Sequence, residues 1–177
     1  MISRRQIIQW SSGAITLGSL PVRSAVTATE GTPGSPTAPQ LITRPIPSTG
    51  EQLPVIGMGT SRTFDTGGDA ESLANLAAVL GAFSAGGGTV IDSSPMYGKA
   101  ESRIGDILRS AEPKAKVFAA TKVWTEGQAE GIAQMEESAR RMHVERFDLI
   151  AVHNLVDWQT QLATLKEWKA QGKVRYI

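Results

Sequence analysis

The chain has 177 residues and a formal net charge of +1, and 41% of its residues are hydrophobic. This length allows one domain with its own core, and the nearly neutral charge argues against a nucleic-acid-binding protein, which normally has a basic face. Cysteine is absent and the two histidines are His143 and His153, so the sequence excludes a disulfide framework and a cysteine-ligated metal site, and we predict no metal.

Residues 1–28 predict a twin-arginine export signal. Arg4 and Arg5 precede a weakly apolar run over residues 10–20, and small residues up to Ala28 predict cleavage after that alanine. The run is too short and too polar to span a bilayer, which takes about 20 apolar residues. We therefore predict a periplasmic protein with no stable membrane anchor that the twin-arginine export machinery recognises. The alternative is an unstructured N-terminus in which the two arginines are adjacent by chance.

A linker and a hairpin precede the rest of the predicted domain. Residues 29–40 are rich in glycine, proline, threonine and serine, and they predict a disordered linker because such a segment cannot bury enough apolar surface to fold. We place the folded domain at residues 41–177. It begins with a predicted hairpin of residues 42–47 and 52–55, which runs into a short apolar strand predicted over residues 53–60.

Strands and helices then alternate along the chain. Apolar residues at helical spacing predict helices at residues 69–84, 100–110, 128–142 and 159–170. Short apolar runs between them predict strands at residues 89–92, 117–124 and 147–152, with another strand beginning at Val174. This alternation is typical of a parallel sheet that is buried by crossover helices.

The predicted fold is an α/β barrel of the (β/α)8 TIM type rather than a doubly wound sheet. Polar residues lie at the C-terminal ends of successive predicted strands, where such barrels carry their active sites. A doubly wound nucleotide-binding sheet is expected to open with Gly-x-Gly-x-x-Gly, and Gly57-Met58-Gly59 lacks the third glycine. We expect the chain to hold about the first half of the barrel, incomplete at its C-terminus, with open sheet edges through which it self-associates.

Three successive predicted strands end in ionisable side chains. These are Asp92, Lys122 and His153, and Tyr97 lies in the loop after the first of them. Because side chains alternate along a strand, we expect all these groups to project from the apolar interior at the same end of the sheet. A single strand-end aspartate often only caps a loop, whereas three ionisable groups at adjacent strand ends indicate a site.

Protonation of a developing alkoxide is the chemistry that these groups fit. A phenol has a pKa near 10, so Tyr97 as a proton donor is helped by the cation of Lys122, which Asp92 can hold in an ion pair. His153 can hydrogen-bond a carbonyl oxygen and polarise it. None of these residues is an obvious nucleophile, so the hydride has to come from a cofactor.

The run from Asp92 to Glu101 resembles the Asp-x-x-x-x-Tyr-Gly-x-x-Glu signature of the aldo-keto reductases. Thr121-Lys122-Val123-Trp124 is similar to the lysine strand of that family, and residues 148–153 are similar to its histidine strand. The hairpin and Gly57-Met58-Gly59-Thr60 resemble its barrel floor and first strand, and residues 168–177 resemble the run that enters its fifth strand. The resemblance covers roughly residues 41–177.

The resemblance implies an NADPH-dependent reductase of small aldehydes and ketones. Tyr97 would be the general acid, Lys122 and Asp92 would tune it, and His153 would orient the carbonyl substrate. By the same resemblance, Gly59, Thr60 and Asp92 would lie near the nicotinamide ribose, and Trp124 would form a wall of the substrate pocket. Asn154 and Leu155 follow the histidine where many members of the family have an aromatic residue and a proline, which leaves the shape of the substrate open.

Two other functions remain open at this stage. The chain could be a non-catalytic remnant or binding module that cannot hold cofactor without a second half of the barrel. It could also be a different barrel enzyme, such as a hydrolase or an aldolase that uses Lys122 as a Schiff base. Glu101, at the start of its predicted helix, is interpreted as favouring the helix N-terminus rather than as a catalytic group.

Overall fold

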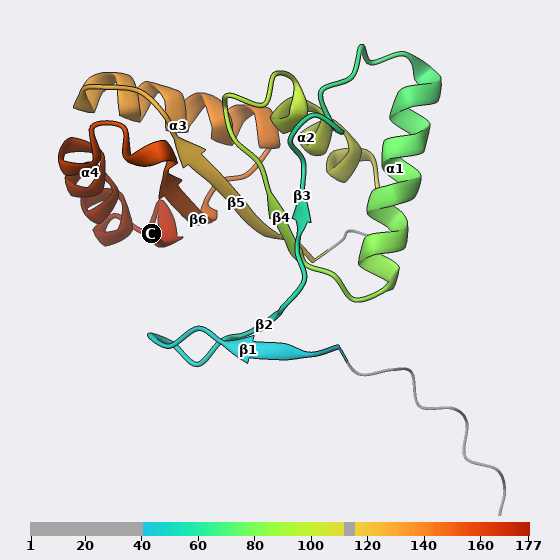
Figure 1. Cartoon of the computed structure of the whole chain (residues 1–177), viewed down its shortest axis with the longest axis horizontal. Helices are drawn as coiled ribbons and strands as arrows, with labels where there is room; N and C mark the ends of the chain where they lie inside the picture. The colour runs from blue at the N-terminus through green and yellow to red at the C-terminus, as the bar shows by residue number, and fades with distance from the viewer. Residues whose placement is uncertain (1–40, 112–115) are drawn as a thin grey trace, which may run out of the picture. The chain divides into compact units, whose positions relative to one another are not determined.

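A computed structural model of the chain describes residues 41–111 and 116–177 (Figure 1). The predicted export signal and linker, residues 1–28 and 29–40, lie outside these residues. Within the two described ranges, no helix has both the length and the apolar character that a membrane span requires.

The described chain begins with an antiparallel hairpin of β1 (Thr43–Pro45) and β2 (Gln52–Pro54). A parallel sheet follows, with the strands β3 (Met58–Gly59), β4 (Val90–Asp92), β5 (Phe118–Val123), β6 (Phe147–Val152) and β7 (Val174–Tyr176). The helices are α1 (Ala70–Ala85), α2 (Ala100–Ser110), α3 (Gln128–Met142) and α4 (Trp158–Ala170), and a short 3-10 helix, η1 (His153–Leu155), follows β6.

The strands lie side by side in chain order, β3-β4-β5-β6-β7, and every pair is parallel. A doubly wound sheet reverses its strand order at a switch point, and this sheet has no reversal among its described strands. Since right-handed crossovers between sequential parallel strands place every helix on the same side, the helices form an arc along the sheet (Figure 1). This arrangement is the wall of a (β/α) barrel, as the sequence predicted.

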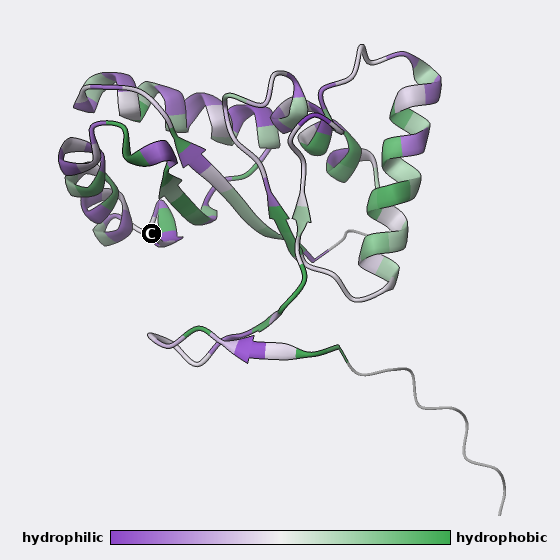
Figure 2. Ribbon diagram, viewed as in Figure 1, coloured by the Kyte–Doolittle hydropathy of each residue, from purple (hydrophilic) through white to green (hydrophobic). Residues whose placement is uncertain are grey.

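The hydrophobic core lies between the sheet and these helices. On the sheet side it contains Ile91, Val123 and Ile150, each 1% exposed or less. The helices contribute the equally buried Ile104 and Met135, and Figure 2 shows apolar residues along β4 and β6. At about 25 cal/mol per Å² of apolar surface removed from water, this layer is the main source of stability in the described fold.

The opposite face of the sheet is only partly covered. Val90 and Asp92 flank the buried Ile91 and are half-buried, and the same alternation appears in β6, where Leu149 and Ala151 flank Ile150. Successive side chains of a strand point to opposite faces. The helix-free face is therefore the one on which Asp92 and its neighbours lie.

The predicted strand over residues 53–60 is wrong in one respect, because it is interrupted. β2 ends at Pro54, although the N–H of Val55 still donates a hydrogen bond of 3.0 Å to the Ile42 oxygen, and β3 starts only at Met58. At Gly57 the backbone passes so close to β4 that an added Cβ would lie 3.1 Å from Val90. The chain thus leaves the hairpin after Val55 and enters the sheet after this close approach.

Glu101 lies in the first turn of α2, as the sequence indicated, and it is also buried, with 1% of its surface exposed. Its Oε1 accepts a hydrogen bond of 2.7 Å from the hydroxyl of Thr121 in β5, and its Oε2 lies 3.7 Å from Nη1 of Arg141 in α3. Burial raises the pKa of the Glu101 carboxyl above its ordinary value. This one side chain therefore links two helices and a strand at the cost of burying a charge.

A pair of glycine-to-alanine variants tests the packing of α2 on α3. An added Cβ at Gly105 would lie 2.1 Å from the backbone oxygen of Arg141, whereas a Cβ at Gly81, in the middle of α1, meets nothing within 4 Å. We expect Gly105→Ala to lower the free energy of unfolding by about 1–3 kcal/mol. Gly81→Ala should raise it by up to about 1 kcal/mol. Urea unfolding of both variants measures the two changes in the free energy of unfolding. Equal changes would contradict the close packing of α2 on α3 at Gly105.

The buried carboxyl of Glu101 predicts a pH-dependent difference between the wild type and Glu101→Gln. Its pKa is raised in the folded state, so the wild type loses stability from this group as pH rises from about 4, near the unfolded pKa, through the folded value. The Gln variant lacks this loss, so it should be more stable relative to the wild type at pH 7 than at pH 4.

A carboxyl on α3 provides a control of opposite sign. Hydrogen bonds from Arg140 and Arg141 lower the pKa of Glu137. Glu137→Gln should therefore lose stability relative to the wild type as pH rises, because the stabilised carboxylate exists only above its pKa. Urea unfolding at several pH values measures both slopes, and slopes of the same sign would overturn the assignment.

Candidate functional site

The site is built around Lys122, the penultimate residue of β5. Its Nζ donates a hydrogen bond of 2.7 Å to Oδ2 of Asp92 and one of 2.8 Å to the backbone oxygen of Ser93. The strand register explains this pairing, because Asp92 lies opposite Ala120 and Lys122 is the next residue on the same face. The Lys122 side chain is 15% exposed and that of Asp92 is 44% exposed, so the ion pair lies at the edge of the interior.

Tyr97 lies beside this ion pair, in the loop between β4 and α2. The centroid of its ring is 5.2 Å from Nζ of Lys122. Backbone hydrogen bonds from Tyr97 to Ser94 and from Ala100 to Tyr97, each 3.0 Å long, form the turn that holds it. At Gly98 the backbone has a φ of +56°, and an added Cβ would lie 2.3 Å from Oδ1 of Asp65. The signature glycine is therefore required for the conformation that presents Tyr97.

His153 completes the group from the end of β6. Its ring meets the Tyr97 ring edge-on, with centroids 6.0 Å apart and an interplanar angle of 87°. Burial is the main cause that lowers the pKa of His153, the positive charge of Lys122 lowers it further, and Asp92 partly opposes both. The imidazole is therefore mainly neutral at neutral pH. The structure thus brings together all four residues that the sequence placed at adjacent strand ends.

Gly59 and Thr60 lie next to Asp92 but have different surroundings. Gly59 pairs with Asp92 in the ladder between β3 and β4, and an added Cβ at Gly59 would meet nothing within 4 Å. Thr60 is fully buried, and its hydroxyl lies 3.0 Å from both the backbone oxygen of Asp92 and Oγ of Ser93. Space is therefore open at Gly59, whereas the Thr60 side chain supports the end of β4.

Trp124 lies just after β5, at the same end of the sheet, and is 41% exposed. Its backbone is held by the side-chain amide of Gln134 in α3. Oε1 of Gln134 accepts from the Trp124 N–H at 2.5 Å, and Nε2 donates to the Trp124 oxygen at 3.1 Å. The loop that carries this exposed indole is therefore fixed by a helix of the barrel wall.

Ser94 and Gln134 are supporting residues that the sequence reasoning missed. Oγ of Ser94 lies 3.0 Å from Nδ1 of His153, 59 residues further along the chain. Ser94 lies inside the signature run, but nothing in the sequence pairs it with a particular histidine. Gln134 is one of several polar residues on a predicted helix, so its spacing carries no signal.

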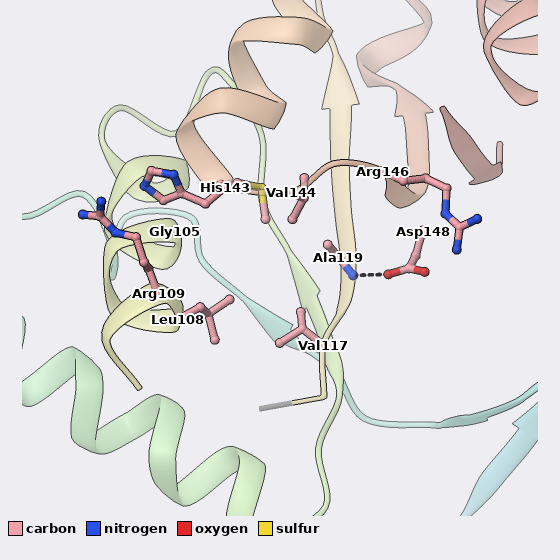
Figure 3. Close-up of a pocket in the computed structure, with 10 residues that line it drawn as sticks. Gly105, Leu108, Arg109, Val117, Ala119, His143, Val144, Arg146 and Asp148 are labelled. Carbon is pink, nitrogen blue, oxygen red and sulfur yellow. Dashed lines mark hydrogen bonds between the residues drawn. The ribbon is translucent and has the colours of Figure 1, made fainter. Parts of the chain in front are cut away.

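A separate pocket of about 380 Å³ lies at the other end of the sheet, near the first residues of β5 and β6. Figure 3 shows Leu108, Val117 and Val144 lining it, with polar groups at its rim. The Asp148 carboxylate there is occupied by the Ala119 N–H and by Arg175. The ionisable cluster and this pocket thus lie at opposite ends of the strands. The cluster is the better candidate for the functional site, because its side chains can transfer and stabilise a proton.

Known proteins with similar sequences are reductases. The family model described as aldo/keto reductase family matches residues 55–177. Methylglyoxal reductase YeaE of Escherichia coli is 33% identical over 129 residues, which make up 70% of this chain and 44% of that protein. Aldehyde reductase YPR1 of Saccharomyces cerevisiae is 30% identical over 117 residues, 66% of this chain and 35% of that protein. The chain therefore spans less than half the length of these curated relatives.

Solved structures give the same result for the fold. The aldo-keto reductase of Klebsiella pneumoniae in complex with NADPH is 28% identical with a TM-score of 0.60, over 71% of this chain and 45% of that one. A Pseudomonas aeruginosa protein that is provisionally named an aldo-keto reductase is 26% identical with a TM-score of 0.64, over 76% of this chain and 57% of that one. These likenesses confirm the predicted parallel α/β barrel wall.

Proposed function

This chain belongs to the aldo/keto reductase family, and from that premise we propose that it carries out NADPH-dependent reduction of small aldehydes and ketones to alcohols. One observation carries the proposal: the Lys122–Asp92 ion pair, 2.7 Å long, lies beneath the ring of Tyr97 with His153 at its edge. The reductase names of the two curated relatives support the substrate class, and the NADPH-bound Klebsiella pneumoniae protein supports the cofactor.

The residues beside Asp92 fit one end of a nicotinamide nucleotide. Gly59 leaves open space where a side chain would stand, and Asp92, its partner in the ladder, keeps 44% of its side chain exposed. A ribose hydroxyl is the kind of group that such a carboxylate hydrogen-bonds. Gly59 and Asp92 would therefore hold the cofactor, with Thr60 supporting them from below. When bound, the reduced nicotinamide supplies the hydride that the carbonyl carbon accepts.

The protein's own groups then manage the proton. Tyr97 donates its hydroxyl proton to the carbonyl oxygen as that oxygen gains negative charge, and the resulting phenolate is reprotonated from solvent. The Lys122 ammonium stabilises the phenolate, and Asp92 and the Ser93 oxygen keep the ammonium in place. His153, mainly neutral because its pKa is lowered, donates a hydrogen bond to the same carbonyl oxygen.

The same contacts disfavour a Schiff base on Lys122. Its Nζ makes two short hydrogen bonds, to Asp92 and to the backbone of Ser93, and forming an imine would disrupt both. A Schiff-base lysine is usually a desolvated amine or one next to another cation, whereas this one is next to a carboxylate. The ion pair thus supports a charge-stabilising role for Lys122 over a nucleophilic one.

We expect Tyr97→Phe to lower carbonyl reduction by about 10²–10⁴-fold, because the phenylalanine cannot donate a proton. Cofactor binding should persist, measured by quenching of tryptophan fluorescence on titration with NADPH. Tyr176→Phe is the matched control, since the Tyr176 hydroxyl binds Glu51 and Thr49 of the hairpin turn. Full turnover in Tyr97→Phe would refute the proposal. A wild type that neither binds NADPH saturably nor turns over a carbonyl compound would instead favour the non-catalytic module, which cannot hold cofactor.

We also propose that the protein is exported to the periplasm through the twin-arginine machinery. The support is the Arg4-Arg5 pair before a short, weakly apolar run. This route carries folded proteins, which suits an enzyme that binds its cofactor before export. Replacing both arginines by lysine keeps the charge, yet it should leave the protein in the cytoplasm. Fractionation of cells that express the wild type or the lysine variant measures where each protein accumulates. A lysine variant that still reached the periplasm would contradict the route.

A further inference from the structure

We propose that Ser94 is a positioning residue that fixes the tautomer of His153, placing the ring proton on Nε2. The catalytic meaning of this inference rests on the proposed reductase function. The tautomer itself is a property of the folded chain and can be measured without any activity. Ser94 comes two residues after Asp92 and is fully buried, so water does not compete for its hydroxyl.

The hydrogen bonds of the Ser94 hydroxyl determine its direction. Its Oγ accepts the backbone N–H of Met96 at 3.4 Å and lies 3.0 Å from Nδ1 of His153. A hydroxyl carries one proton to donate, and a buried donor needs an acceptor. Among the hydrogen bonds of the described residues, His153 Nδ1 is the acceptor that remains for this proton. Nδ1 therefore accepts, and it carries no proton of its own.

The assignment of Nδ1 as an acceptor has a consequence because the His153 ring is mainly neutral. Burial and the nearby Lys122 lower its pKa, so the ring is mainly neutral and carries one proton. With Nδ1 accepting from Ser94, that proton lies on Nε2. Nε2 is then the donor available to a substrate oxygen. In the other tautomer Nε2 would be an acceptor, and it would repel the carbonyl oxygen that it has to polarise.

Ser94 also connects the histidine to the general acid. Its backbone oxygen accepts the N–H of Tyr97 at 3.0 Å and so starts the turn that presents the phenol. The same residue thus holds Tyr97 through its main chain and His153 through its side chain. A change in one contact is expected to affect the placement of both groups around the carbonyl oxygen.

Long-range proton–nitrogen NMR of the histidine-labelled chain tests the tautomer directly, because the two ring nitrogens differ in chemical shift according to which is protonated. The chain has two histidines, so His143→Asn identifies the signals of His153. At about pH 8, where histidine is neutral, wild-type His153 should be mainly the Nε2–H form. A wild type in the Nδ1–H form would overturn the inference, whether or not any variant folds.

Variants of the two neighbouring serines separate the effect of Ser94 from a general loss of packing. Ser94→Ala should raise the fraction of the Nδ1–H form, and Ser94→Thr, which keeps a hydroxyl, should restore the Nε2–H form. Ser93→Ala is the matched control, because the hydroxyl of Ser93 is also buried but contacts Thr60 instead of the histidine. An unchanged tautomer in Ser94→Ala, or an equal change in Ser93→Ala, would overturn the inference.

Kinetics then distinguish this inference from the proposed function. Ser94→Ala should lower kcat for carbonyl reduction by about 10- to 100-fold with KM little changed, and Ser94→Thr should recover most of it. If the tautomer responds as described while the wild type reduces no carbonyl compound, the proposed function fails and the positioning role of Ser94 stands. If the wild type is active and the His153 tautomer does not change in Ser94→Ala, the positioning role of Ser94 fails and the proposed function stands.

Discussion

The interaction between Lys122 and the end of β4 is the constraint on which the site depends. The Lys122 side chain is only 15% exposed, so its ammonium group needs nearby acceptors, and these are the Asp92 carboxylate and the Ser93 oxygen. Those acceptors are in place only if β4 and β5 pair in the observed register, because a slip of one residue would turn Lys122 to the helix side. The register of the sheet therefore determines the geometry of the site.

One face of the sheet provides most of the packing that stabilises the fold, and the other face carries the candidate site. The helix side is apolar and close-packed around Ile91, Val123 and Ile150. Among residues 41–111 and 116–177, its one buried carboxyl group is that of Glu101, which accepts a hydrogen bond from Thr121 and lies near Arg141. The other face carries the ionisable groups that the site uses. Because the helix side supplies the packing, polar side chains on the opposite face add little cost to folding.

Much of this arrangement could be predicted from local sequence signals. The helices over residues 100–110 and 128–142 have the predicted bounds, because each carries an apolar stripe at helical spacing. The meeting of Asp92, Lys122 and His153 follows from the rule that parallel strands bring their C-terminal ends to one edge. The contact between Ser94 and His153 could not be predicted, since it joins residues 59 positions apart and depends on loop conformation.

Backbone strain gives an independent indication of where function lies. Of the five described non-glycine residues with positive φ, three follow β6 directly: Asn154, Leu155 and Asp157. Such conformations cost about 1–3 kcal/mol each for residues other than glycine and persist only where other contacts hold them. Here Asp157 accepts the Gly127 N–H at 2.8 Å, and the Val156 N–H bonds the His153 oxygen at 3.2 Å. The strained turn therefore fixes the backbone at His153, which fits the role that we propose for this residue.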